Sequence, residues 1–384
     1  MTIGDRSLNA EMVYFLFDSA NMHRWNDHLR TIDLTELDKQ AHKASIAWVL
    51  GKYEESEGNS VDWRRIIEHS LFSFIERMAM TDLKPQVFHR IKREKSKEVV
   101  EFVLKSFDEA VPSMDNRFRG RLEAYLKGDR GTFEDGIIDA AHYLATRWEF
   151  NLIRDANKER YGIEQTRKEI DSQVFRYLNF IGVKRLMAGQ EASDFVDLIG
   201  QLRFQQRWAR TPRIPRTTVL GHSLFVADLM FLSDLDEDAD PRQIYNDFYS
   251  ALFHDLPEVL TKDVISPVKM NVDGLSKLLE DYEREMVEER IMPLIPMDWH
   301  DDLRCMVYDP FTDMEDPTMG RRRGLDLKSC DRLAAYIEAH VSISYGISSK
   351  SLREGERELE EKLFESGEGI CARGLIEDFK RLMI

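Results

Sequence analysis

The sequence has few cysteines, no long apolar run and no excess of basic residues. Its three cysteines, Cys305, Cys330 and Cys371, form no close pair in 384 residues, which argues against a disulfide framework and a zinc knuckle. No apolar run approaches the roughly 20 residues of a bilayer-spanning helix. The polar start of the chain does not resemble a signal peptide. We therefore predict a cytoplasmic protein without a membrane partner.

The charge balance is acidic, with a formal net charge of −16 at pH 7. Non-specific nucleic-acid binding needs a basic face that neutralises phosphates, so a nucleic-acid partner and a nuclease are both disfavoured. A small phosphorylated substrate remains compatible, because a metal ion and one or two arginines can neutralise its charge locally. The basic run Arg321-Arg322-Arg323 follows an acidic loop, and we predict that it is a solvated loop edge.

Apolar residues recur at spacings of three and four along most of the chain, the pattern of helices that bury one face. Glycine and proline gather between these segments, and no series of alternating strands is found. The fold class is therefore predicted to be all-α. The predicted helices are Glu11–Met22, Ala41–Tyr53, Trp63–Met80, Ser96–Ala110, Gly136–Arg154, Asp194–Trp208, Gly221–Ser233, Ile244–Leu260, Gly274–Ile291, Lys328–Ser344 and Glu356–Phe364.

The two halves of the chain repeat each other at nearly constant offsets. Arg24-Trp25 matches Arg207-Trp208 at 183, Leu71 to Phe74 matches Leu252 to Asp255 at 181, and His42 matches His222 at 180. Such regularity over several helices indicates an internal duplication. We predict one domain over residues 1–188 and a second over residues 189–384.

The duplication is unequal. The second half has His254-Asp255 and Glu258, where the first half has Ser73-Phe74 and Arg77. Serine and phenylalanine cannot replace an imidazole and a carboxylate as metal ligands, so the first half is predicted to be catalytically silent. Arg77 is expected to supply the positive charge that a metal supplies in the second half. The first-half residues that remain are read as structural relics: His42, Asp82 and Asp139.

The second half contains a candidate metal centre. His254 and Asp255 are adjacent in an apolar run, His222 lies one predicted helix upstream, and Asp331 lies further downstream. Two imidazoles and two carboxylates form a mixed nitrogen and oxygen set that suits a divalent first-row metal. Such an ion can generate a hydroxide beside a phosphate.

These motifs carry a resemblance to a known family. The matching elements are Gln206-Arg207-Trp208, Gly221-His222-Ser223, the run from Phe253 to Asp263, Ser266 to Lys269, and Cys330 to Tyr336. Residues 194–345 resemble the HD-domain metal-dependent phosphohydrolases, most of all the bacterial 5′-deoxynucleotidase branch, and the first half resembles a decayed copy. The resemblance implies tandem HD-domain helical bundles, of which the N-terminal one is degenerate.

The resemblance also implies a role for each site residue. His222, His254, Asp255 and Asp331 correspond to the four metal ligands, and the metal is one of Mn, Co, Ni, Mg, Fe or Zn. Glu258, three residues after Asp255, and Asp263 would be the catalytic acids that move protons or orient water. Three residues would bind substrate: Arg207 and Lys269 at the phosphate, and Trp208 against the sugar.

The expected activity is removal of phosphate from nucleoside 5′-monophosphates, with deoxynucleotides preferred. A triphosphohydrolase acting on dNTPs is the alternative within the class, with additional basic groups from Arg203, Arg210, Arg213 and Arg216. A nucleotide-binding regulatory module is the alternative outside it. Relatives with one domain often pair, so the two halves are expected to form an intramolecular pseudo-dimer. Further homo-oligomers stay open.

Overall fold

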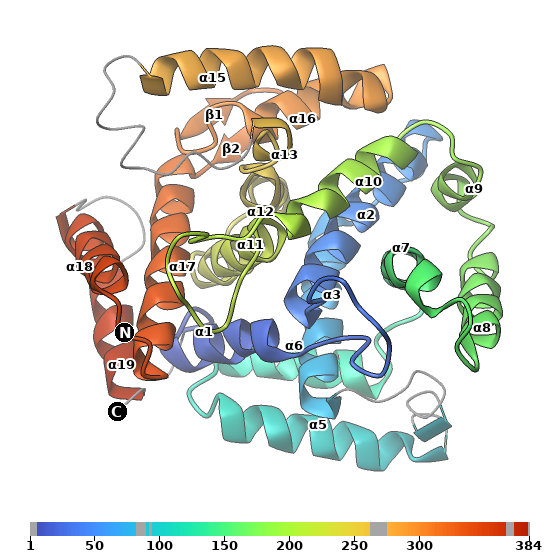
Figure 1. The fold of residues 1–384 in the computed structure, drawn as a ribbon, viewed down its shortest axis with the longest axis horizontal. Helices are drawn as coiled ribbons and strands as arrows, with labels where there is room; N and C mark the ends of the chain where they lie inside the picture. The colour runs from blue at the N-terminus through green and yellow to red at the C-terminus, as the bar shows by residue number, and fades with distance from the viewer. Residues whose placement is uncertain (1–5, 82–89, 92–93, 262–274, 366–371, 383–384) are drawn as a thin grey trace.

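Two long, almost entirely buried helices, α2 (Glu36–Ser56) and α11 (Val219–Asp236), pack against each other near the centre of the molecule (Figure 1). The structure is a computed structural model and describes residues 6–81, 90–91, 94–261, 275–365 and 372–382. Its main cluster of buried apolar side chains contains residues from both halves of the chain. The predicted all-α class is confirmed, and the boundary between residues 188 and 189 stays a prediction.

The remaining helices surround this central pair. Those of the first half are α1 (Ala10–Phe17), α3 (Trp63–Met80), α5 (Ser96–Ala110), α6 (Asn116–Lys127), α7 (Phe133–Asn157), α8 (Ile163–Phe175) and α9 (Ile181–Met187). Those of the second half are α10 (Ser193–Gln201), α12 (Pro241–Phe253), α13 (Glu258–Thr261), α15 (Leu275–Met286), α16 (His300–Val307), α17 (Gly324–Ser344), α18 (Lys350–Glu365) and α19 (Ala372–Leu382). Figure 1 places α15 along one edge of the molecule and α5 along the opposite edge.

Local sequence signals fix where the central helices begin. The Thr35 side chain caps α2 by accepting a hydrogen bond from the backbone N–H of Asp38, and Thr218 caps α11 in the same way through Gly221. Capping satisfies one of the backbone donors that a helix start leaves unpaired. Asp240 caps α12, and Pro241 occupies its first turn, where a missing N–H costs nothing.

Aromatic side chains join the two halves across the core. The indole of Trp48 on α2 donates a hydrogen bond of 3.0 Å to the hydroxyl of Tyr245 on α12. Its ring lies 5.4 Å from that of Phe253, also on α12, and Phe17 lies 5.3 Å from Phe225 on α11. Aromatic pairs at such distances add to the free energy gained by burying their apolar area. The helices of the second half are therefore held in place partly by those of the first.

One predicted helix is interrupted at the site of interest. The apolar pattern predicted a continuous helix over Ile244–Leu260, but α12 ends at Phe253 and α13 begins only at Glu258. Pro257 lacks a backbone N–H and disfavours helical geometry in the residue before it. Asp255 and Glu258 are therefore joined by a turn and not by a continuous helix.

The predicted loop around residues 309–323 contains a short hairpin of β1 (Met314–Asp316) and β2 (Gly320–Arg322). The arginine run there is not a solvated edge. Arg322 is buried and donates to the backbone oxygens of Asp309 and Thr312, and Arg323 pairs with buried carboxylates of α11 and α12. Only Arg321 is exposed as predicted. Within the described ranges, none of the helices has the length and apolarity to cross a membrane.

His42 provides a test of the packing between α2 and α10. It is fully buried, with Nε2 3.0 Å from the carbonyl oxygen of Val196 and its ring against Trp148. Burial, together with the nearby Arg203 guanidinium, lowers the pKa of His42 to about 3. The unfolded chain, with an ordinary histidine pKa near 6.5, therefore binds more protons between these values. Stability should fall as the pH drops through this window, by up to about 1.4 kcal/mol per pH unit.

We expect His42→Gln, which keeps a donor for Val196 but cannot titrate, to flatten that pH dependence by about one proton. Urea unfolding of both chains between pH 4 and pH 6.5 measures the difference. His23→Gln, at an exposed histidine, is the matched control and should keep the native slope. Equal slopes for His42→Gln and the native chain would contradict the buried, uncharged state of His42.

Candidate metal centre

Three helices of the second half bring the predicted ligands together. His222 lies in the first turns of α11, and Asp331 lies in the first half of α17. His254 and Asp255 lie in the turn that follows α12. His222 and His254 are buried, and Asp255 and Asp331 are partly exposed. The two carboxylates therefore stand on the side of the histidines that faces outward.

The nitrogen and oxygen atoms of this cluster converge. One ligand atom from each of His222, His254 and Asp255 lies within 4.8 Å of the other two. Asp331 Oδ1 lies 2.9 Å from His222 Nε2 and 3.9 Å from His254 Nε2. His254 Nε2 lies 3.3 Å from Asp255 Oδ1. His222, His254 and Asp255 thus surround one small volume, and Asp331 adjoins it through its contacts with the two histidines.

The chemistry of this donor set fits a divalent cation. Among the described residues, the buried His254 Nε2 and Asp255 Oδ2 have no hydrogen-bond partner, and such atoms are costly unless something binds them. His254 Nδ1 donates to the Ala251 carbonyl oxygen at 2.7 Å, which leaves the Nε2 lone pair directed at the cluster. A second ring nitrogen held in this way is typical of metal-binding histidines.

Glu338 is a buried carboxylate that contacts His222 of the cluster, and it was not predicted from the sequence. It lies two turns after Asp331 on α17 and is fully buried. Its Oε1 lies 3.4 Å from His222 Nδ1 and accepts a hydrogen bond of 2.5 Å from the Thr217 hydroxyl. A carboxylate at Nδ1 favours the tautomer whose Nε2 can bind a cation. The available signal was the seven-residue spacing from Asp331 on an apolar helix.

The same carboxylate holds the predicted substrate-binding pair. Glu338 Oε2 accepts from Trp208 Nε1 at 2.9 Å and from Arg207 Nε at 3.4 Å. The other end of the Arg207 guanidinium lies 3.6 Å from Asp255 Oδ2. Arg207 therefore spans from the buried carboxylate to the predicted ligand cluster, with its side chain 16% exposed.

Electrostatics keep these groups charged. Burial alone would lower the pKa of Arg207, but neighbouring carboxylates, Glu338 and Asp255 first among them, raise it above its ordinary value. Burial would raise the pKa of Glu338, yet the arginines beside it and His222 hold it well below the usual range. Burial would likewise raise the pKa of Asp331, but His222, His254 and Arg207 together lower it. Asp331 is therefore a carboxylate across the physiological pH range.

The predicted catalytic acids are only partly placed. Glu258 lies at the start of α13, and its backbone N–H donates to the Asp255 carbonyl oxygen at 3.1 Å. Its backbone oxygen accepts a hydrogen bond of 2.8 Å from Gln205. Asp263 and Lys269 lie outside the described residues, and their roles stay predictions.

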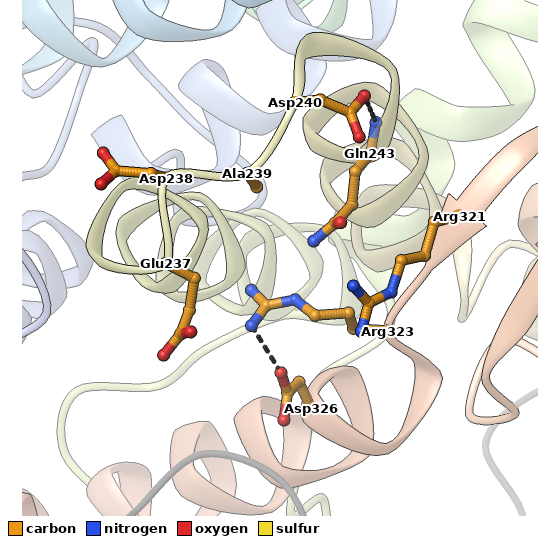
Figure 2. Close-up of a pocket in the computed structure, with 8 residues that line it drawn as sticks. All are labelled: Glu237, Asp238, Ala239, Asp240, Gln243, Arg321, Arg323 and Asp326. Atoms are coloured by element: carbon orange, nitrogen blue, oxygen red, sulfur yellow. Dashed lines mark hydrogen bonds and ion pairs between the residues drawn. The ribbon is translucent and has the colours of Figure 1, made fainter.

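A polar cavity of about 540 Å³ lies elsewhere in the second half (Figure 2). It is lined by the acidic stretch after α11 and by arginines of the hairpin, and Arg323 pairs there with Asp326 at 2.7 Å. None of the predicted site residues lines it. Its lining has four carboxylates, two guanidinium groups and no histidine, so its chemistry differs from that of the ligand cluster.

The first half has no comparable cluster among its described residues. Ser73 and Phe74 stand on α3, where neither offers a metal ligand. His42 is engaged with Val196, and Asp139 accepts a hydrogen bond of 3.2 Å from the Tyr177 hydroxyl. Asp82 lies outside the described residues.

A known protein family matches the second half of the chain. Residues 199–360 match the family model described as HD domain. This stretch begins within α10, ends within α18 and includes all four predicted ligands. The second half of the chain is therefore similar to an HD domain.

Parts of the chain are also similar to individual proteins. The chain is 25% identical over 177 residues to the 5′-deoxynucleotidase of Vibrio atlanticus (strain LGP32), a match covering 44% of this chain and 84% of the relative. It is 24% identical over 159 residues to a 5′-deoxynucleotidase of Vibrio vulnificus (strain YJ016), covering 41% and 78%. An HD-domain phosphohydrolase structure from Listeria innocua covers 50% of this chain and 88% of its own, at 19% identity and a TM-score of 0.42.

Proposed function

We propose that the chain is a divalent-metal-dependent phosphohydrolase that removes phosphate from nucleoside 5′-monophosphates, with deoxynucleotides preferred. The observation that carries the proposal is the convergence of His222, His254, Asp255 and Asp331 on one small volume. A divalent ion held by these residues would polarise a phosphoryl oxygen and lower the pKa of a water molecule. The similarity to 5′-deoxynucleotidases supports the choice of substrate.

Arg207 is assigned to the phosphate. Glu338 anchors its Nε, and its terminal nitrogens face the ligand cluster. A guanidinium fixed at one end presents a planar pair of donors that matches two phosphate oxygens. It would stabilise the charge that gathers on the phosphoryl group in the transition state.

Glu258 and Asp263 are assigned to proton movements. Glu258 follows Asp255 across a single turn, and we infer that its carboxylate lies beside the phosphate. A carboxylate there can orient the attacking water or protonate the leaving sugar oxygen. Lys269 is retained as a further phosphate contact on the resemblance alone.

The arginines near Arg207 favour a monophosphate over a triphosphate. Arg203 is buried and pairs with Glu149 at 3.2 Å. Arg213 is buried beside Thr217 and Glu338. Only Arg210 and Arg216 are exposed. Two of the four basic groups that a triphosphate would use are thus occupied by carboxylates or hydroxyls of the chain.

The contacts between α2 and α11 support the first half as a structural partner. The Thr218 hydroxyl, at the start of α11, donates to Asp38 Oδ1 at 2.5 Å. A Cβ added at Gly221 would lie 2.7 Å from that same oxygen, so the helices approach as closely as glycine allows. On this basis we infer an intramolecular pseudo-dimer that keeps α11, and with it His222, in position.

A phosphate-release screen tests the function directly. The full chain is stripped of metal, supplied with Mn²⁺, Co²⁺, Ni²⁺, Mg²⁺, Fe²⁺ or Zn²⁺, and given dAMP, AMP, dADP and dATP. We expect metal-dependent release of inorganic phosphate from dAMP, faster than from AMP. Triphosphate release from dATP alone would replace the proposal by a triphosphohydrolase. No turnover with any ion, together with nucleotide binding, would replace it by a regulatory module.

Trp208 gives a more local test, because α18 packs on its ring. A Cβ at Gly355 would lie 2.8 Å from Trp208 Cη2 and 2.9 Å from Cζ3. Gly355→Val should therefore displace the indole from its place beside Glu338. We expect KM for dAMP to rise about tenfold, as for a lost sugar contact, with metal content unchanged. Gly120→Val, at a helical glycine with no neighbour within 4 Å, is the control and should keep the native KM.

A further inference from the structure

The loops that enter the two central helices have the same construction. His23 forms an isolated antiparallel bridge with Thr35, and Gln206 forms one with Thr218. Each residue of the second pair stands 183 places after its counterpart. Both threonines then cap the helix that follows. The start of α2 therefore corresponds to the start of α11 at an offset of 183, not at the offset of 180 that pairs His42 with His222.

The groups beneath these loops also correspond. Arg24 Nε and Trp25 Nε1 donate to Glu149 Oε2 at 2.9 and 3.0 Å, as the arginine and tryptophan of the second half do to Glu338. Trp25 has a φ of 54°, and Trp208 a φ of 55°, values that few non-glycine residues adopt. Unusual backbone geometry and a buried carboxylate recur together.

In this register two basic residues stand where metal ligands stand in the second half. Lys39 occupies the position of His222, 183 places earlier, and His142 that of Asp331, 189 places earlier. The second offset is also the one between Glu149 and Glu338. Lys39 Nζ and His142 Nδ1 are in hydrogen-bond contact, just as their counterparts are.

A second ammonium group reaches the position expected for the histidine of the His-Asp pair. Lys43, one turn after Lys39 on α2, donates to Ser73 Oγ at 2.8 Å and to the Ser70 carbonyl oxygen at 3.3 Å. Ser73 is the counterpart of His254. Lys39 and Lys43 are both buried. Lys39 thus contacts the equivalent of the predicted ligand on α17, and Lys43 contacts the equivalent of the predicted histidine ligand in the turn after α12.

The glutamates nearest these lysines are shared with arginines. Glu36 lies between Arg24 at 2.7 Å and Arg77 at 3.5 Å, and Glu149 is shared between two arginines, while Asp228 and Asp139 add negative charge near Lys43. Burial, followed by the positive charges of the surrounding lysines and arginines, lowers the pKa of His142 well below its usual value. Burial likewise lowers the pKa of Lys43 to about 8 and that of Lys39 well below its usual value. The two glutamates nearest the lysines are thus already engaged by arginines.

We propose that these residues form a second, metal-free site that binds a phosphate monoester anion. It is called the pseudo-centre here and consists of Lys39, Lys43, Ser73, Arg77 and His142. Ser73, Arg77 and His142 are partly exposed, so the cluster is reached from solvent on that side. The lysine contacts with described residues use one N–H of Lys39 and two of Lys43, and an ammonium has three.

The chemistry differs from that of the second half in one respect. Ammonium and guanidinium groups hold an anion by charge and hydrogen bonds but cannot act as a Lewis acid or activate water. The pseudo-centre therefore retains a phosphate ester without cleaving it. That the ester is a nucleotide rests on the function proposed above, whereas the anion site rests on the cations alone.

The proposal is tested by measuring how inorganic phosphate and dAMP, each used separately, bind to the full chain in EDTA. Calorimetry and ³¹P line broadening monitor the binding. We expect both to bind without metal. Lys43→Met, which keeps the length of the side chain, and Arg77→Gln should each weaken binding at least about tenfold. Arg321→Gln, at an exposed arginine outside both sites, should leave the metal-free affinity unchanged. Binding of dAMP but not phosphate would identify the nucleoside as the main contact and overturn the anion site.

Three further results would overturn the proposal. They are no binding to the native chain in EDTA, unchanged binding in both pseudo-centre variants, or loss of binding only in Arg207→Gln, which alters the phosphate contact assigned to the second half. The native-chain measurement decides even if both variants misfold, which their circular dichroism would reveal. Failure here leaves phosphate release by the second half intact. Conversely, phosphate binding in EDTA without any metal-dependent phosphate release would contradict the proposed hydrolase and support the pseudo-centre.

Discussion

His254→Ala and Asp255→Asn should each reduce metal-dependent phosphate release by about three orders of magnitude, because several kcal/mol of transition-state stabilisation depends on the ion. His254 contributes a buried Nε2 that no described group satisfies, and Asp255 a buried oxygen in the same state. Losing either leaves three of four ligands. Asp255→Asn keeps the size of the side chain, so the free energy of unfolding should change little in the metal-free chain, whereas His254→Ala also removes the buried hydrogen bond from Nδ1 to Ala251 and should lower it by about 1–3 kcal/mol.

Initial rates with dAMP and a metal titration of each variant measure this effect. His23→Ala changes an exposed histidine of the first half and should match the native chain in both. An His254→Ala chain that keeps native activity at saturating Mn²⁺ would mean that the chemistry lies elsewhere. Loss of activity accompanied by unfolding would be structural, so circular dichroism accompanies each rate.

Glu338→Gln is expected to have the second largest effect, and it acts on two properties at once. The glutamate is buried among two arginines, a tryptophan and a histidine. Removing one partner of a buried ion pair costs about 3–5 kcal/mol of stability. Loss of the acceptor at His222 Nδ1 should also weaken metal binding by about 10- to 100-fold.

Trp208→Phe separates these contributions, since it deletes one donor to Glu338 and leaves the carboxylate and His222 in place. It should lower stability by only about 1 kcal/mol and keep the native metal affinity. Urea unfolding and metal titration of both variants give the comparison. Native metal affinity in a folded Glu338→Gln chain would contradict the orienting role assigned to this residue.

The sequence predicted the helices where local signals were complete. α3 and α5 have the predicted bounds of Trp63–Met80 and Ser96–Ala110, because each has a clear apolar face and a breaker beyond its end. The break after Phe253 was missed, because the apolar pattern runs on through His254 while Pro257 ends the helix. Periodicity reports which face is buried, and it does not report where backbone hydrogen bonds stop.

The candidate site shows a similar division. His222, His254, Asp255 and Asp331 were predicted from order and residue type, and the structure brings them together. Glu338 was missed because its importance comes from contacts more than 100 residues away in sequence, which one sequence cannot reveal. The roles of the predicted residues remain proposals until they are measured.

The central claim is that one divalent ion binds where His222, His254, Asp255 and Asp331 converge. Crystals of the full chain grown with Mn²⁺, with diffraction measured at the manganese absorption edge, test it most directly. We predict a single strong anomalous peak within bonding distance of all four side chains. A peak elsewhere, or none at saturating Mn²⁺, would contradict it.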